Sequence, residues 1–402
     1  MLKLDRRLVT ILLIVFVQML GASMVLPILP LYAQRRFAME PQVITLLLTT
    51  FFAAQFVAGP WIGRLSDKYG RVPVLIVSQI GTAISFAMIG FAESVAILFI
   101  ARLFDGITGG NVVVAQAYVT DITKREDRTK ALGYIFAAFG MGFVFGPALG
   151  GVLSAAFGPT VPFILAAIAA AAVVVLTWFT LDETLTPEQR AHNRAFRQSL
   201  NFTAVWNNYF LMVVLLVVFV GQFGLGLLQS TFALYGGAVL FADATPEVTD
   251  LGIGLLLSVV GLTQVFTQSL VLPRLTRRYA DTTLIVAGAL IRTIGLTIFA
   301  IVTSPWLGGF GSFFFALGMG VMMPPLQAYT THVVADELRG GVLGLYQSAV
   351  SLATIFSTAL GGLLFAISPT TPYWLAAGLS LIAIIPVVTL LRQPVVAVSH
   401  KP

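Results

Sequence analysis

The sequence has no cysteine and few charged residues. Among its 402 residues, the absence of cysteine excludes disulfide bonds, thiolate catalysis and cysteine-based metal sites. Asp, Glu, Lys and Arg make up only 10% of the chain, whereas 58% is hydrophobic and the mean hydropathy is +0.94. Soluble globular domains carry about 25% charged residues. The composition therefore predicts a polytopic membrane protein.

Sequence signatures of enzymes are missing as well. The three histidines, His192, His332 and His400, fall in a loop, at a helix end and in the tail, without the spacing of metal ligands. No G-x-S-x-G, H-E-x-x-H or nucleotide-binding loop occurs. We therefore expect no enzymatic activity, no cofactor and no bound metal, and an ion gradient as the energy source.

Twelve apolar segments run along the chain, and each is long enough to cross a hydrocarbon core of about 30 Å. They span residues 7–33, 42–65, 73–92, 95–121, 129–156, 160–181, 207–240, 249–272, 281–302, 304–331, 338–366 and 370–392. The sequence thus predicts an all-α membrane protein with twelve transmembrane helices.

The distribution of positive charge predicts the orientation of these helices. If both termini are cytoplasmic, nineteen of the 23 Lys and Arg residues lie on the cytoplasmic side, and only Arg35 and Arg36 lie in outer loops. Such an excess is typical of cytoplasmic loops. We expect an integral plasma-membrane protein, in the inner membrane if the source is bacterial. The net charge of +6 then reflects topology and not a nucleic-acid partner.

The second half of the chain repeats the first. Gln116-Ala117-Tyr118 recurs as Gln327-Ala328-Tyr329, and the same offset relates Leu132-Gly133 to Leu343-Gly344 and Ala148-Leu149-Gly150-Gly151 to Ala359-Leu360-Gly361-Gly362. A constant offset near half the length predicts two pseudo-symmetric six-helix bundles. The predicted division is an N-terminal bundle at 1–181, a cytoplasmic linker at 182–206, a C-terminal bundle at 207–392 and a cytoplasmic tail at 393–402.

A pair of opposite charges lies inside the fourth span. Arg102 and Asp105 are three residues apart, so on a helix they share a face and can pair, while Gly106 and Gly110 offer a small surface to a neighbouring helix. Because an ionisable residue in a membrane span marks a substrate, ion or proton pathway, we assign the pair to proton coupling. The alternative is a structural pair that neutralises itself.

The turn between the second and third spans also carries alternating charges. It reads Gly63-Arg64-Leu65-Ser66-Asp67-Lys68-Tyr69-Gly70-Arg71. Asp67 is placed to cap a facing helix, and Arg71 to pair with Asp121 at the inner end of the fourth span. We expect these contacts in only one packing of the two halves, which would make the turn a conformational switch.

This turn closely resembles the G-x-x-x-D-[RK]-x-G-R motif of the major facilitator superfamily. Pro27-Ile28-Leu29-Pro30 resembles the P-x-L-P end of the first span in that family, and Arg102 with Gly106 and Gly109 resembles its fourth-span motif. Within the fifth span, the residues that match the G-x-x-x-G-P-x-x-G-G pattern of drug:proton antiporters are Gly142, Gly146, Pro147, Gly150 and Gly151.

The resemblance implies a major facilitator fold and a proton-coupled exporter of amphipathic, drug-like small molecules, similar to the tetracycline and multidrug efflux branch. Its implied partners are the small-molecule substrate, protons and membrane lipid, and a monomer is expected. Gln18 stands where the tetracycline-like branch often carries an acid, which argues against tetracycline itself. Two other classes stay open: a proton-linked importer or facilitator of a sugar-like or small polar solute, and a non-transporting receptor or scaffold.

The glycines of the fifth span also indicate a packing role that does not depend on the family resemblance. Gly142, Gly146 and Gly150 recur every four residues and form a smooth packing stripe, and Pro147 weakens the helix beside them. A packing stripe without a hinge is the simpler alternative. In the second half Ser357-Thr358 replaces Gly146-Pro147, so we expect the hinge in one half only.

Polar residues in the spans that face the centre of this fold are candidates for substrate contact or, equally, for bonds between helices. The candidate set is Gln18, Asn111, Gln116, Gln222, Gln229, Gln264, Gln327 and Gln347. Arg292, near the middle of the ninth span, has no acidic partner that the sequence identifies. Because that span is peripheral in the family, we expect Arg292 to snorkel or to bind lipid phosphate.

Overall fold

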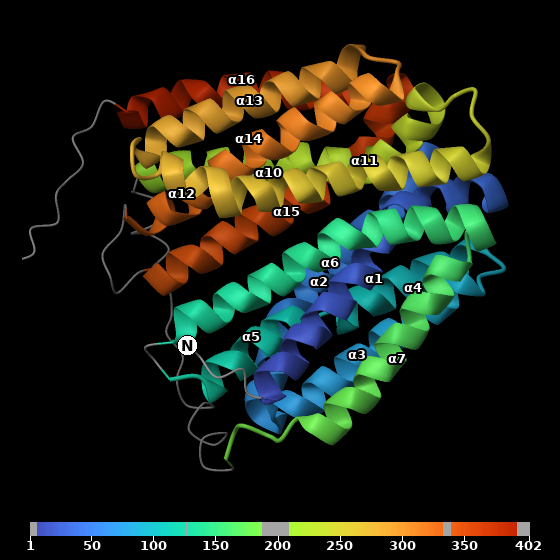
Figure 1. Cartoon of the computed structure of the whole chain (residues 1–402), viewed down its shortest axis with the longest axis vertical. Helices are drawn as coiled ribbons and strands as arrows, with labels where there is room; N and C mark the ends of the chain where they lie inside the picture. Colours follow the sequence, from blue (N-terminus) through green and yellow to red (C-terminus); the bar gives the residue numbers. More distant parts are fainter. Residues whose placement is uncertain (1–5, 125–126, 187–208, 333–338, 392–402) are drawn as a thin grey trace, which may run out of the picture.

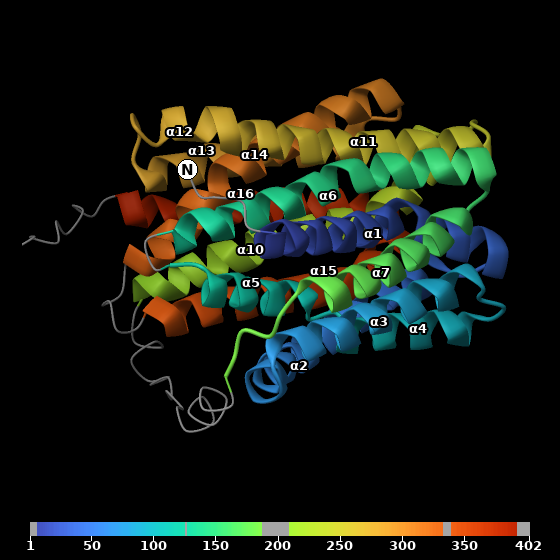
Figure 2. The same ribbon diagram turned by 60° about the horizontal axis from the view of Figure 1, so that its bottom comes forward.

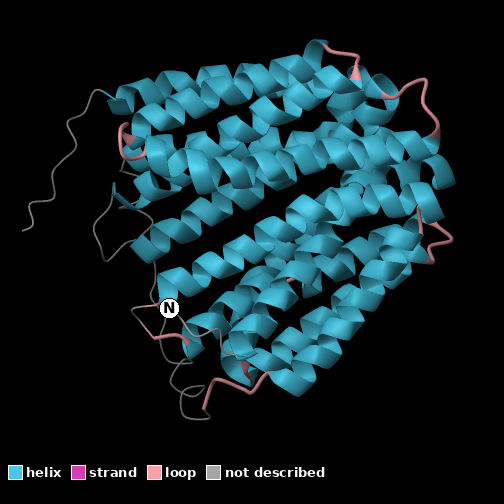
Figure 3. Cartoon of the chain, viewed as in Figure 1, coloured by secondary structure: helices cyan, strands magenta, loops and turns pink. Residues whose placement is uncertain are grey.

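The computed structural model describes residues 6–124, 127–186, 209–332 and 339–391, and these residues form helices without any strand (Figure 3). Twelve helical segments are long and apolar enough to cross a membrane. The prediction of an all-α protein with twelve membrane spans is therefore confirmed.

The first half contains seven helices. They are α1 (Arg6–Phe37), α2 (Pro41–Tyr69), α3 (Arg71–Gly90), α4 (Val95–Thr108), α5 (Asn111–Ile122), α6 (Arg128–Phe157) and α7 (Val161–Thr180). Local signals explain several boundaries, because Pro41 starts α2 and Gly70, at φ 111°, allows the sharp turn into α3.

The second half repeats this order with two π-helical turns, η1 and η2. Its elements are α10 (Tyr209–Tyr235), η1 (Gly236–Leu240), α11 (Pro246–Phe266), η2 (Thr267–Val271), α12 (Leu272–Leu275), α13 (Asp281–Ile301), α14 (Pro305–His332), α15 (Arg339–Ile367) and α16 (Thr371–Leu391). Thr245 caps α11 by accepting a hydrogen bond from the Val248 amide, and Pro246 follows at the first helical position.

The fourth span is not one continuous helix. It divides into α4 and α5 at Gly109 and Gly110, so the single helix expected over residues 95–121 is wrong. Two adjacent glycines disfavour helix energetically, and Gln55 Nε2 on α2 donates a hydrogen bond to the Gly109 carbonyl at 3.2 Å. The break follows directly after the segment that carries Arg102 and Asp105.

The two halves form separate bundles that lie side by side. In Figure 1 the blue and green helices α1–α7 make one bundle, and the yellow to red helices α10–α16 make the other. Two seams join them, with α6 against α11 and α2 against α15 (Figures 1 and 2). Helix α1 begins and α16 ends on the same side of the molecule. We call this the termini side, and the opposite one the far side.

The bundles touch mainly on the far side. Hydrogen bonds cross the seams from Arg35 and Ser154 to Asp250, between Thr49 and Thr358, and from the Gly362 amide to Thr45. A fifth, from Ser258 to the Val144 carbonyl, lies near the middle of α6 and α11. Towards the termini side the ribbons of the two bundles diverge (Figure 1).

The buried apolar residues follow the same division. The larger hydrophobic cluster runs from the far half of the N-terminal bundle, with Ile28, Ile44 and Phe163, into the C-terminal bundle. A second cluster, with Leu8, Ile11 and Tyr118, stays within the termini half of the N-terminal bundle. The shared core therefore holds the bundles together mainly on the far side.

Candidate functional site

Arg102 and Asp105 form a buried ion pair on α4. Arg102 Nη2 lies 3.0 Å from Asp105 Oδ2, and the two side chains are only 5% and 7% exposed. The guanidinium also lies over the ring of Phe51 on α2, 5.4 Å from its centre. Arg102 Nε is buried without a hydrogen-bond partner among the described residues. The pair is thus removed from water, and most of its compensation comes from its own two charges.

Two further polar side chains connect this pair to neighbouring helices. Thr82 on α3 lies close enough to the Asp105 carboxylate to interact with it, and Gln18 Nε2 on α1 donates to Thr82 Oγ1 at 3.3 Å. Gln18, a candidate for substrate contact or for a bond between helices, therefore makes a bond between helices inside the N-terminal bundle. A change in the charge of Asp105 on α4 would therefore alter contacts with Thr82 on α3 and, through Thr82, with Gln18 on α1.

The glycines that follow the ion pair fit α4 and α5 closely to α2. A Cβ at Gly106 would collide with the Phe51 carbonyl oxygen and lie 2.7 Å from the Ala54 Cβ, and one at Gly110 would collide with Ile62. These contacts explain the spacing of small residues in the fourth span. They hold the ion pair against α2, the helix that forms one of the two seams.

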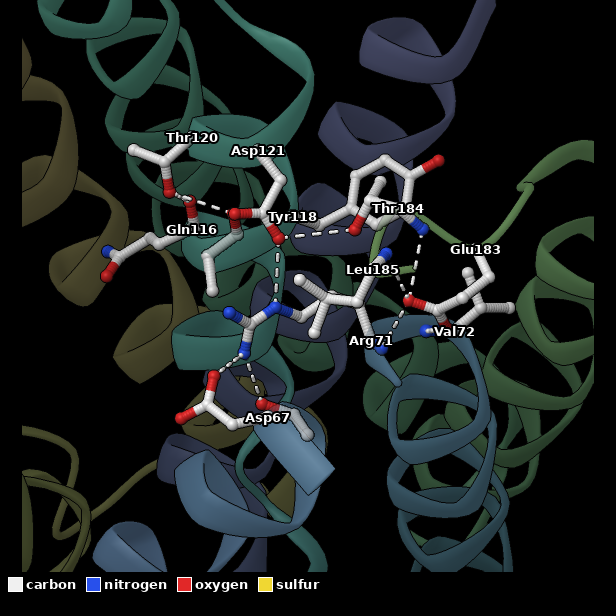
Figure 4. A network of polar contacts seen from close by, with 12 residues as sticks. Asp67, Arg71, Val72, Gln116, Tyr118, Thr120, Asp121, Glu183, Thr184 and Leu185 are labelled. Carbon is white, nitrogen blue, oxygen red and sulfur yellow. Dashed lines mark hydrogen bonds and ion pairs between the residues drawn. The ribbon is translucent and has the colours of Figure 1, made fainter. Parts of the chain in front are cut away.

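A second charged cluster lies on the termini side, around Arg71 (Figure 4). Arg71 Nε contacts Asp121 Oδ2 at 3.0 Å, and its Nη1 contacts Asp67 Oδ1 at 2.7 Å and donates to Ser66 Oγ at 2.7 Å. The predicted partnership of Arg71 and Asp121 is present. Asp67 binds Arg71 and caps no facing helix among the described residues. All these residues belong to one bundle, so no contact of this cluster in the described part of the chain depends on how the halves pack.

Glu183, which follows α7, belongs to this cluster although no sequence pattern predicts it. Its carboxylate accepts hydrogen bonds from the backbone amides of Arg71 at 3.0 Å and Val72 at 3.1 Å, so it satisfies the first turn of α3 (Figure 4). Thr184 Oγ1 donates to Asp121 Oδ2 at 3.2 Å. The first residues after α7 therefore hold α3 and α5 together, which no local sequence pattern indicates. Gly70, at φ 111°, places Arg71 at this corner, whereas Gly63 lies within α2, where a Cβ would meet open space.

Asp250 forms the third charged cluster, on the far side. It is 3% exposed, contacts Arg35 Nη1 at 2.8 Å and accepts a hydrogen bond from Ser154 Oγ at 2.6 Å. Arg35 comes from α1, Ser154 from α6 and Asp250 from α11, so this cluster joins the two bundles. No sequence pattern assigns a role to Asp250, which lies at the end of a predicted span.

The glycines of the fifth span lie on α6 and face two helices. A Cβ at Gly142 would lie 2.7 Å from the Met19 Cβ, one at Gly146 would collide with Ser23 Oγ, and one at Gly150 would lie 3.1 Å from the Met24 carbonyl oxygen, all on α1. Gly151 instead faces α11, where Gly254 approaches the carbonyl of Pro147. The motif thus packs α6 between its own bundle and the other one.

The candidate substrate residues do not gather at one place. Gln222 Nε2 donates to Thr354 Oγ1 at 3.4 Å within the C-terminal bundle, whereas Gln327 and Gln347 are exposed. Gln229 lines a small cavity between the bundles together with Pro147. The remaining members, Gln116 and Gln264, are half-buried, and Asn111 begins α5 with its side chain outside the described part.

Arg292 does not snorkel to the membrane surface. It is 1% exposed, and its Nη1 donates to the Gly221 carbonyl at 2.8 Å while its Nη2 bonds to Ser380. The expectation of a lipid contact is therefore wrong, because α13 turns this side chain inward between α10 and α16.

Twelve membrane-spanning helices in two similar bundles, with buried charges at the middle and at both ends, define a membrane transport protein. The chain belongs to the Major Facilitator Superfamily, whose family model matches residues 11–244 and 230–402. It is 31% identical to the class C tetracycline resistance protein of Escherichia coli over 92% of both chains. It is 27% identical to multidrug resistance protein 2 of Bacillus subtilis over 90% of this chain and 89% of that one.

Solved structures show the same fold at lower identity. The crystal structure of the nucleoside transporter NupG superposes with a TM-score of 0.79 at 13% identity, over 97% of this chain and all of the other. The family and the relatives together make the protein an integral membrane transporter that resembles drug-efflux proteins.

Proposed function

We propose that the protein exports amphipathic small molecules in exchange for protons, by alternating access of the two bundles. The observation that carries this proposal is the Arg102–Asp105 pair, buried at 5% and 7% exposure beside a break in the fourth span. Buried ionisable groups next to interrupted helices are typical of coupling sites in transporters. Similarity to tetracycline and multidrug resistance proteins supports export as the direction.

The proposed cycle uses the buried charge as its trigger. While Asp105 is ionised it compensates Arg102, and the N-terminal bundle keeps its packing. Once Asp105 takes up a proton, the guanidinium is left with the Phe51 ring as its main compensation, which costs several kcal/mol in hydrocarbon. Rearrangement of α4 against α2, through the close contact at Gly106, would relieve this cost and pass the change to the seam with α15.

The remaining parts of the proposal concern orientation and organisation. The excess of Lys and Arg supports a cytoplasmic termini side, so the far side would face outward and the described state would be closed to the outside. We place the boundary between the bundles in the segment 182–206, and propose a monomer in the plasma membrane, with lipid around it. The segment's first residues are bound to the N-terminal bundle through Glu183.

Proteoliposomes with an internal pH dye test the coupling. Under an imposed proton gradient, amphipathic drugs should cause proton movement in the wild type, and Asp105→Asn should abolish it. Glu93→Gln, which changes an exposed acid in the turn between α3 and α4, is the matched control and should behave as wild type. Intact proton-coupled transport in Asp105→Asn would refute the assignment, and drug flux without protons in the wild type would make the protein a facilitator.

A further inference from the structure

Arg292 is a buried cation without an anionic partner among the described residues. Its guanidinium donates from Nη1 to the Gly221 carbonyl at 2.8 Å, lies 3.6 Å from Met319 Sδ and bonds through Nη2 to the Ser380 hydroxyl. Its Nε has no hydrogen-bond partner in this part of the chain. All of its partners are therefore neutral.

The other arginines that are buried, or that tie helices together, contact carboxylates. Arg71 contacts Asp67 and Asp121, Arg102 contacts Asp105, and Arg35 contacts Asp250. An uncompensated charge in a protein interior or in hydrocarbon costs several kcal/mol. Because Arg292 stands apart from this pattern, its counter-charge has to come from outside the described chain if the cost is to be offset.

Gly221, whose carbonyl accepts a hydrogen bond from Arg292, lies on α10, a helix that also contacts α1 of the other bundle. A Cβ at Gly221 would lie 3.3 Å from Arg292 Nη1, 2.9 Å from Met322 Cε and 3.5 Å from Met323 Sδ. Met323 is only partly buried. Thioether side chains are flexible and adapt their packing readily. The side chains packed beside Arg292 at Gly221 are thus methionines, which can shift to admit a ligand group.

We propose that the transported molecule carries an anionic group, a carboxylate or a sulfonate, that pairs with Arg292 during transport. Guanidinium groups bind such planar or branched anions through paired hydrogen bonds, and Arg292 has an unused Nε–H for this purpose. The inference rests on the proposed export function and narrows its substrate class. Arg292 would then select substrates that carry a negative charge, while the apolar surfaces of the bundles bind the apolar part of the substrate.

A matched pair of dyes tests this inference. 8-Anilinonaphthalene-1-sulfonate and N-phenyl-1-naphthylamine share one aromatic skeleton and differ by the sulfonate. In proteoliposomes under a proton gradient, with dye uptake measured by rapid filtration, Arg292→Gln should slow movement of the sulfonate at least tenfold and leave the neutral amine within twofold of wild type. Equal effects on the two dyes, or wild-type transport of the neutral dye alone, would overturn the inference.

Two further variants separate anion binding from a purely structural bond. Arg292→Lys keeps the charge and should retain part of the sulfonate transport, and Ser380→Ala removes a neutral partner and should keep the preference for the sulfonate. If Lys and Gln at position 292 lose both dyes equally, and Ser380→Ala does the same, Arg292 serves only to hold α10, α13 and α16 together.

Binding without transport separates this inference from the proposed function. In nanodiscs, the sulfonate dye should raise the melting temperature of the wild type, measured by circular dichroism, and should leave that of Arg292→Gln unchanged. That result without gradient-driven uptake of either dye would uphold the anion site and refute proton-coupled export. If gradient-driven uptake is the same in the wild type and Arg292→Gln, and the dye changes their melting temperatures equally, the anion site alone is refuted.

Discussion

Replacing Asp250 by asparagine is expected to weaken the contact between the two bundles on the far side. The carboxylate of Asp250 lies between Arg35 Nη1 at 2.8 Å and Ser154 Oγ at 2.6 Å. Asparagine keeps the shape of the side chain and one oxygen that can accept from Ser154. The substitution therefore removes the charge that links α11 to α1 and leaves the packing in place.

The size of the effect follows from the burial of the two partners. Breaking a fully buried ion pair costs about 3–5 kcal/mol, and exposed pairs contribute about 0.2–1 kcal/mol. Since the side chain of Asp250 is 5% exposed and that of Arg35 is 34% exposed, we expect about 1–2 kcal/mol. The far-side-open population should rise about 5- to 30-fold.

The absence of cysteine makes this measurement clean, because introduced cysteines are the sole labelling sites. Gly133→Cys on α6 and Gly344→Cys on α15 suit spin labels, since a Cβ at either position meets open space. Opening of the far side should close the termini side. Asp250→Asn should therefore add a shorter distance between the two labels to the distribution measured by double electron–electron resonance. Arg35→Gln should act more strongly, because it leaves a buried carboxylate alone. Distributions identical to wild type in both variants would refute the reasoning.

Three other sets of substitutions test the seams and the termini-side cluster. Thr49 and Thr358 have hydroxyls 3.0 Å apart across the α2–α15 seam, so oxidation of a Thr49→Cys/Thr358→Cys protein should block dye transport and a reductant should restore it, whereas either single variant should be insensitive. Glu183→Gln should lower the free energy of unfolding by about 1 kcal/mol, seen in thermal melts, since it removes a charge from the start of α3; a melt equal to wild type would contradict its capping role. Gly151→Ala and Gly362→Ala should each destabilise their seam by about 1–3 kcal/mol, while Gly133→Ala and Gly344→Ala, which meet open space, should melt no lower than wild type.

Much of the fold follows from patterns within the sequence. Apolar runs of sufficient length predict the twelve spans, and a constant offset between repeated segments predicts two similar bundles. The pairing of Arg102 with Asp105 follows from their three-residue spacing on one helix. Each of these features can be predicted because it depends on residues within one segment, or on the direct comparison of two segments.

What the sequence does not predict depends on contacts between distant segments. Glu183 follows α7 in the sequence but binds the start of α3, and Asp250 of one bundle contacts Arg35 of the other. Periodicity identifies a helix but not which neighbour each face meets. It therefore predicts a lipid contact for Arg292 and leaves the glutamines divided between substrate contact and bonds between helices. The sequence likewise does not predict the break at Gly109 and Gly110, because glycine pairs also occur in continuous helices at close helix crossings.

The repeat shows how one contact can be kept while its residues change places. In the first half, Gly146 on α6 lets the Ser23 hydroxyl of α1 approach; in the second, Ser357 on α15 supplies the hydroxyl and Gly226 on α10 supplies the space. The close approach is therefore present in both halves, although the sequence of the fifth span alone indicates it in only one.

The glycine pairs beside this contact keep both their order and their roles. Gly150 and Gly361 face their own bundle, on α1 and α10, whereas Gly151 and Gly362 face the other bundle, on α11 and α2. Each repeated pair thus sets one contact inside a bundle and one across a seam. Since Pro147 has no counterpart in the second half, the two seams share their packing and differ in stiffness, so we expect α6 to bend where α15 moves as a rigid helix.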